Sequence, residues 1–181
     1  FFQNNSLNFL NKVNKGLFID VSEEKVIKLK SIIKLLYPLK NISVIKEYVD
    51  KDNLNLIIRK YFNNNEEIDF LSIDIDGNDY YLFENLKFKP KVICIEYNFR
   101  FGPDVKCSIP YDKNFTWETG SPYFGASLNS LCVLAKSKGY FLIALESSCV
   151  NAFFIRSDFK DNFEIINNIK SFKTPKYVSK N

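Results

Sequence analysis

Residues Phe70 to Asp79 read FLSIDIDGND, and this stretch decides the fold of the chain. Four apolar or small residues lead into three carboxylates, Asp74, Asp76 and Asp79, with Gly77 between the last two. An apolar run of strand length that ends at a glycine turn predicts a buried parallel strand. Parallel α/β sheets bind their ligands outside the carboxyl ends of such strands, and buried carboxylates need partners. We therefore expect these acids to meet a ligand, a cation, a helix N-terminus or water.

Strand and helix patterns alternate on both sides of this stretch. The expected strands are 16–20, 42–49, one that starts at 70, 90–98, 140–147 and 151–157, and the expected helices are 23–37, 53–62, 79–86 and 127–138. This alternation predicts an α/β fold with a doubly wound, mostly parallel sheet. The last two strands are three residues apart, which predicts an antiparallel hairpin that closes one edge. Residues 99–125 are rich in Pro, Gly and aromatic residues without a period, as is typical of a lid or binding loop.

The composition excludes several classes of function. A chain of 181 residues with 46% hydrophobic residues fits one globular domain. Arginine occurs only at Arg59, Arg100 and Arg156, and the net charge is only +4, which argues against a nucleic-acid partner. The sequence has no histidine, so a Ser-His-Asp triad, a Cys-His pair and His-ligated zinc are excluded. A general base must then be a carboxylate, Lys, Tyr or Cys.

The four cysteines and the hydropathy indicate the compartment. Cys94, Cys107, Cys132 and Cys149 show no CxxC and no metal-ligand spacing, which favours a reduced cytoplasmic chain over a disulfide framework. No stretch reaches the roughly 18 apolar residues of a membrane span, and no signal-peptide pattern is visible. We therefore expect a cytoplasmic protein without a membrane span.

Two metal-dependent functions fit the sequence DIDG by itself. In phosphatases of the haloacid-dehalogenase type, a strand runs into Asp-x-Asp-Gly, but the downstream acidic pair of that class is missing here. In a sugar-nucleotide glycosyltransferase, Asp74 and Asp76 would bind manganese as an Asp-x-Asp pair. Strand followed by Asp-x-Asp is a common pattern, so the second function stays open as an alternative.

Four linked segments carry a family resemblance. They are FLSIDIDGNDYYLFENL, PKVICIEYN, PYFGASLNSLCVLAKSKGY and VNAFFIRSD, in this order and spacing. Together they resemble the FkbM-like branch of class I S-adenosylmethionine-dependent methyltransferases, over roughly residues 4–158. The resemblance implies a Rossmann-like sheet with an antiparallel hairpin, and transfer of a methyl group from S-adenosylmethionine, usually to a hydroxyl. The acceptor would be a sugar, a lipid-linked molecule or a secondary metabolite.

The resemblance also implies roles for the acids at the strand ends. Asp20 would bind the ribose of the methyl donor. Asp74 and Asp76 would line the donor and acceptor site, and Gly77 would let the backbone approach the ligand. Asp74 is our first candidate for the base that takes the acceptor proton.

Further candidates lie on the acceptor side. Glu96 is the second candidate for the catalytic base, and Asp79, Asn98 and Tyr111 are candidate substrate-binding residues. Each of the last three also has a structural interpretation: Asp79 as a first-turn helix acid, Asn98 as a turn residue and Tyr111 as loop packing. Asp20 could likewise cap the helix that follows it.

The chain departs from the family pattern at its start. The strand and Gly-rich turn that open such enzymes are not present before Gly16, so we expect residues 1–158 to be an N-terminally truncated methyltransferase-like domain and 159–181 a peripheral tail. Without the first strand the sheet would be incomplete, which could lead to self-association or leave a non-catalytic remnant of a methyltransferase. Activity of the chain as written is therefore an open question at this point.

Overall fold

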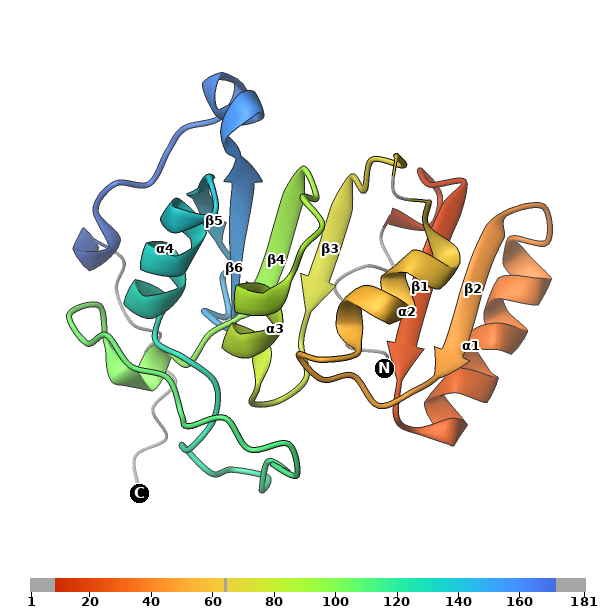
Figure 1. Ribbon diagram of the computed structural model, residues 1–181, viewed down its shortest axis with the longest axis horizontal. Helices are drawn as coiled ribbons and strands as arrows, with labels where there is room; N and C mark the ends of the chain where they lie inside the picture. Colours follow the sequence, from red (N-terminus) through yellow and green to blue (C-terminus); the bar gives the residue numbers. More distant parts are fainter. Residues whose placement is uncertain (1–8, 64, 172–181) are drawn as a thin grey trace. The chain divides into compact units, whose positions relative to one another are not determined.

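The computed structural model describes residues 9–63 and 65–171, which form two compact units divided after Asn64. Figure 1 shows the elements of both units along the chain. Each unit combines strands with helices, so the α/β class expected from the sequence is confirmed. Among the described residues the strands form two sheets, and the prediction of one doubly wound sheet is not confirmed.

The N-terminal unit is a parallel strand pair with a helical crossover. Its elements are β1 (Lys15–Asp20), α1 (Glu23–Leu36), β2 (Asn41–Lys46) and α2 (Leu54–Tyr61). β1 pairs with β2 in parallel, from Lys15 opposite Asn41 to Asp20 opposite Lys46. The buried core of this pair comes from one face of α1 and from β2, and consists of Val26, Leu29, Ile33 and Val44. A helix is needed here because parallel neighbours cannot be joined by a tight turn.

Local signals set the ends of the helices as the sequence predicted. Ser22 precedes α1 and its Oγ accepts a hydrogen bond from Lys25 N at 3.4 Å, while acidic residues occupy the first turn. Ser127 precedes α4 (Leu128–Ser137), and its Oγ accepts a hydrogen bond from Ser130 N at 3.1 Å. Both serines satisfy N–H groups that a helix leaves without partners at its start.

The C-terminal unit contains the mixed sheet that carries the candidate site. Its strands are β3 (Phe70–Ile73), β4 (Val92–Glu96), β5 (Tyr140–Leu145) and β6 (Asn151–Arg156), and its helices are α3 (Asp79–Asn85) and α4. The strand order is β3-β4-β6-β5, with β3 and β4 parallel and β6 antiparallel to both of its neighbours. The expected antiparallel hairpin is therefore present, and its second strand is the one that lies beside β4.

The core of this unit is almost completely shielded from solvent. α4 packs on β5 and α3 on β3. The apolar side chains that are at most 2% exposed include Leu82, Phe83, Ile93, Ile95, Leu131, Phe154 and Ile155. The near-continuous apolar run of β4 is explained by its position between β3 and β6, because a central strand is buried on both faces.

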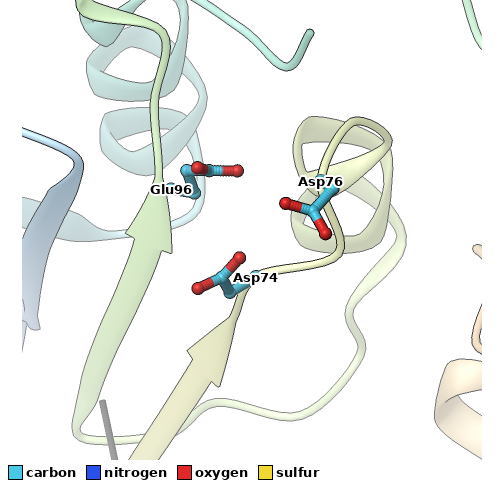
Figure 2. Close-up of side chains that lie close together, drawn as sticks. All are labelled: Asp74, Asp76 and Glu96. Carbon is cyan, nitrogen blue, oxygen red and sulfur yellow. The ribbon is translucent and has the colours of Figure 1, made fainter. Parts of the chain in front are cut away.

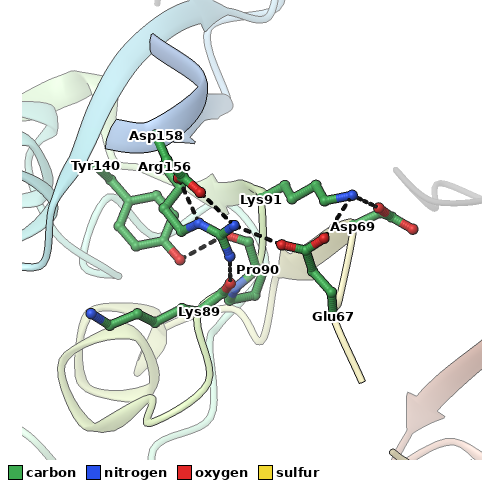
Figure 3. Close-up of polar contacts among 8 residues, drawn as sticks. All are labelled: Glu67, Asp69, Lys89, Pro90, Lys91, Tyr140, Arg156 and Asp158. Carbon is green, nitrogen blue, oxygen red and sulfur yellow. Dashed lines mark hydrogen bonds and ion pairs between the residues drawn. The ribbon is translucent and has the colours of Figure 1, made fainter. Parts of the chain in front are cut away.

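An ion network closes the end of this sheet where β3 and β4 begin (Figure 3). Arg156 at the end of β6 contacts Glu67 through Nη2 and Asp158 through Nε, both at 2.7 Å. Lys91 contacts Glu67 at 2.9 Å and Asp69 at 2.7 Å. This network ties three chain segments together at the end of the sheet away from the FLSIDIDGND turn.

Several boundaries differ from those expected. The second strand ends at Lys46, three residues before the predicted end, and β5 ends at Leu145. The expected tail begins inside a 3-10 turn, Ser157–Asn162, and Ile166 N donates a hydrogen bond to Leu142 O at 2.9 Å. Residues 172–181 of that tail lie outside the described residues, as does the start of the predicted domain, residues 1–8. Self-association stays a prediction.

Candidate functional site

Three carboxylates gather at the carboxyl ends of β3 and β4, as Figure 2 shows. Asp74 follows β3 directly, Asp76 lies on the turn that leads to α3, and Glu96 is the last residue of β4. One oxygen from each lies within 4.8 Å of the others. β3 and β4 are parallel neighbours, so their carboxyl ends come to the same edge of the sheet. The acids expected at the carboxyl ends of these strands therefore lie together at one edge of the sheet, and their binding of a ligand stays a prediction.

The turn that presents these acids is built around Asp79. This residue is only 1% exposed, and its carboxylate accepts hydrogen bonds from Ile75 N and Gly77 N, both at 2.9 Å. Asp76 adopts a φ of 58°, a left-handed conformation that Asp tolerates better than most residues. Asp79 thus stabilises the turn through these two backbone hydrogen bonds. Substrate binding by Asp79 stays a prediction without support from this geometry.

The electrostatics of the cluster favour a proton on Glu96. The pKa of Glu96 is raised to about 9, mainly by burial and then by the nearby Asp79, Asp74 and Asp76, in that order. Glu96 Oε2 is buried and has no hydrogen-bond partner among the residues that the structure describes. Burial likewise raises the pKa of Asp79 to about 6, against the lowering effect of its two backbone donors. Glu96 is therefore neutral near pH 7, since its proton relieves repulsion from the neighbouring carboxylates and avoids placing a charge on a largely desolvated group.

Gly77 makes a close contact that a side chain would prevent. A Cβ atom built on Gly77 would lie 2.4 Å from two ring carbons of Phe115, so the ring packs directly against the glycine backbone. Asn78, the next residue, is 5% exposed and donates from Nδ2 to Asp112 O at 2.8 Å. The turn after β3 therefore contacts the segment 99–125 at two neighbouring points.

Asn98 holds the other arm of the same segment. Its side chain is 1% exposed, and Nδ2 donates to Pro122 O at 2.8 Å and to Phe124 O at 3.0 Å. Its Oδ1 accepts a hydrogen bond from Arg100 N at 3.1 Å, so both polar atoms of the amide are used within the protein. The structural interpretation of Asn98 as a turn residue is supported, and its contact with an acceptor stays a prediction.

The two other predicted residues are placed as follows. Tyr111 packs edge-on against Tyr81 of α3, with ring centroids 5.3 Å apart. Asp20 ends β1 in the N-terminal unit, where Oδ1 accepts a hydrogen bond from Ser22 N at 2.7 Å and Oδ2 lies 3.7 Å from Lys25 Nζ. Asp20 thus supports the start of α1, and its role in ribose binding stays a prediction.

Sequence reasoning missed two residues that shape this site. Phe115 was one aromatic residue among many in the segment 99–125, and Asn78 was one polar residue of a turn. Gly77 was the available signal, because a glycine in a tight turn can mark a place where another group approaches the backbone closely. The sequence could not say which side chain approaches it.

The cluster can interact with positively charged groups of two kinds. Carboxylate oxygens are the ligands that hard divalent cations such as Mg²⁺ prefer, and the three acids together offer at least three. An organic cation would also lower the repulsion among these acids.

Comparison with known proteins defines the class. A mixed α/β architecture with ligand-type residues at parallel strand ends is compatible with a methyltransferase fold. A family model described as the methyltransferase FkbM domain matches residues 9–142, well over half of the chain. The chain therefore belongs to the FkbM methyltransferase family, and the resemblance seen in the sequence is confirmed. A search of curated proteins found no match.

The same findings bear on the alternatives. Nothing in the comparisons supports a glycosyltransferase that uses Asp74 and Asp76. Within residues 9–63 and 65–171, no helix is both long and apolar enough to cross a membrane, in agreement with the hydropathy of the sequence.

Proposed function

We propose that this chain is an S-adenosylmethionine-dependent methyltransferase that acts on a hydroxyl group of a sugar, a lipid-linked molecule or a secondary metabolite. Family membership supports the class of reaction. The observation that carries the proposal is the acid cluster of Asp74, Asp76 and Glu96, in which the buried Oε2 of Glu96 lacks a partner among the described residues. The strand order β3-β4-β6-β5, with β6 antiparallel between its neighbours, supports a methyltransferase fold.

The residues of the cluster fit a methyl donor with a positive charge. The donor would supply an electrophilic methyl group on a sulfonium. Asp74 and Asp76 are both exposed, and their negative charges would favour a nearby positive centre over a neutral one. Glu96 is neutral near pH 7 because burial raises its pKa to about 9, so it can donate a hydrogen bond to a ligand oxygen. Such a hydrogen bond would give the buried carboxyl group of Glu96, whose Oε2 has no partner among the described residues, a partner in the ligand.

Two of the acids differ in their suitability as a base. Glu96 already holds a proton near pH 7, so it cannot take another from an acceptor hydroxyl. Asp74 lies at the end of β3, exposed to solvent and therefore accessible to an acceptor. We accordingly propose that Asp74 takes the proton of the acceptor hydroxyl and that Glu96 donates a hydrogen bond to the ligand. Since methyl transfer is a displacement with little covalent work for the protein, positioning of the two substrates supplies most of the rate.

Calorimetry with S-adenosylhomocysteine and with S-adenosylmethionine tests the proposal. Both compounds are expected to bind the wild-type chain. The substitution Asp74→Asn should weaken binding of the positively charged S-adenosylmethionine more than that of the neutral thioether, because one favourable charge is removed. Asp69→Asn is the matched control, since Asp69 is an exposed acid at the opposite end of β3, where it pairs with Lys91.

Two other results would change the assignment. Heat from manganese with a nucleotide-sugar, and none from S-adenosylhomocysteine, would replace the proposal with the glycosyltransferase alternative. Binding of neither ligand would leave a non-catalytic remnant of a methyltransferase as the best account.

A further inference from the structure

The aromatic segment between β4 and α4 contains an excursion, residues 110–124, that is closed at its base. Ser108 and Ala126 form an antiparallel bridge. Ile109 N donates to Gly125 O at 2.9 Å, and Ser127 N donates to Cys107 O at the same distance. The two arms of the segment are therefore paired with each other before and after the excursion. A loop closed in this way leaves and returns to the body of the unit at one fixed place.

Two buried asparagines fasten the excursion on either side of the acid cluster. Asn78 lies two residues after Asp76 and donates to Asp112 O, near the start of the excursion. Asn98 lies two residues after Glu96 and donates to the carbonyls of Pro122 and Phe124, at its end. Asn78 lies in the turn between β3 and α3, and Asn98 lies two residues after the end of β4, so the excursion is attached close in sequence to Asp76 and to Glu96.

Phe115 lies between these two attachment points. Its ring contacts the backbone of Gly77, the residue between Asp76 and Asn78. Tyr123 extends the aromatic surface, with its ring centroid 6.1 Å from that of Phe115 and 54% of its surface exposed. Trp117 anchors the far part of the excursion by donating from Nε1 to Ser121 O at 3.0 Å and packing edge-on against Phe124 at 6.1 Å.

We propose that Asn78 and Asn98 are positioning residues. They hold residues 110–124, called the wall from here on, on the acceptor side of the carboxylate cluster. Phe115 is the part of the wall that contacts the turn at Gly77. The proposal rests on the proposed function for its reference to an acceptor. The chain continues from β4, whose last residue is Glu96, into the wall, and the arms of the wall pair with each other through the backbone at Ser108 and Ala126. An acceptor therefore meets a surface that does not have to fold around it, which lowers the ordering cost of binding.

The fluorescence of Trp117, the single tryptophan of the chain, tests the positioning role without any ligand. Asn98→Ser removes the two donations to the excursion, and Asn78→Ser removes the other one. Either change should shift the Trp117 emission to longer wavelength and raise the rate of tryptic cleavage after Lys113 by roughly tenfold. The reason is that the lost hydrogen bonds no longer contribute to the free energy of local opening of the excursion. Asn85→Ser, which removes an exposed amide contact within α3, is the matched control and should change neither readout.

The outcomes separate the two parts of the proposal. Unchanged emission and cleavage in both asparagine variants would overturn the positioning role, whatever the chain binds. If the more deeply buried Asn98 variant fails to fold, the Asn78 variant alone decides this point. Calorimetry then tests the side of the site: Phe115→Ala should leave the affinity for S-adenosylhomocysteine within about twofold of the wild type. A loss of affinity of tenfold or more would place the wall on the donor side and overturn the acceptor assignment. If S-adenosylhomocysteine does not bind the wild type, both that assignment and the proposed function are overturned.

Discussion

Neutralising Glu96 should make the C-terminal unit less sensitive to alkaline pH. The pKa of Glu96 is raised from an ordinary 4.5 to about 9 by burial and by the neighbouring acids. Between these values the folded chain holds a proton that the unfolded chain has lost, so stability falls as pH rises. One such proton changes the free energy of unfolding by about 1.4 kcal/mol for each pH unit. Glu96→Gln imitates the protonated form and removes this dependence.

The pH range can be chosen to isolate Glu96. Asp79 also has a raised pKa, but only to about 6, so its contribution with the same sign is complete above that pH. Between about pH 6.5 and about pH 8.5 the wild type should lose up to about 3 kcal/mol through Glu96, while the Gln variant should change little. At the upper end of this range the variant is expected to be the more stable protein.

Urea unfolding followed by the fluorescence of Trp117 measures this difference in the unit that contains Glu96. Glu84→Gln, a change of the same kind at an exposed acid on α3, is the control and should preserve the wild-type slope. The reasoning is refuted if Glu96→Gln and the wild type lose stability in parallel over this range. That result would mean that water or a cation already stabilises the ionised form of Glu96 in the folded chain.

Two further substitutions test the packing around the site and the ion network. Gly77→Ala should destabilise the C-terminal unit by about 1–3 kcal/mol, because the new methyl group would lie 2.4 Å from the Phe115 ring. Adding Phe115→Ala should recover much of that loss of stability. If the effects of the two substitutions are simply additive in urea unfolding, the contact between the two residues is contradicted. Gly16→Ala, where a Cβ atom has 3.9 Å to its nearest neighbour, is the control and should show no comparable loss by circular dichroism. Arg156→Met should cost roughly 1–2 kcal/mol at low salt by breaking the pairs with Glu67 and Asp158, and a cost that is unchanged at about 1 M salt would argue against an electrostatic role for the network.

Much of the fold could be predicted because its signals are local. The helix after Ser22 and the helix after Ser127 begin where a capping side chain reaches the first turn. The nearly continuous apolar run of 90–98 predicted a strand, and the structure has β4 at Val92–Glu96 between β3 and β6. Strand ends were less certain, since β2 stops three residues early without a local signal in the sequence. The number of sheets also depends on contacts between distant segments, which no local pattern specifies.

The candidate site was predictable in its acids and less so in its architecture. Position at the end of a strand was enough to single out Asp74, Asp76 and Glu96, but the same reasoning also included Asp20, which ends β1 in the N-terminal unit. The sequence did not distinguish the exposed acids from Asp79, which is buried beneath the turn with two backbone donors. Burial and donor geometry make that distinction, and both depend on how the chain packs.

The sequence by itself determined the alternation of strands and helices, the hairpin near the end and the stretch that carries the acids, because each depends on periodicity or on turn chemistry within a few residues. Only the tertiary structure decided that β6 lies between β4 and β5, that Phe115 packs on Gly77, and that burial and neighbouring acids raise the pKa of Glu96. These features join residues far apart in the chain, and their energies arise from burial and close contact between segments rather than from any one segment alone.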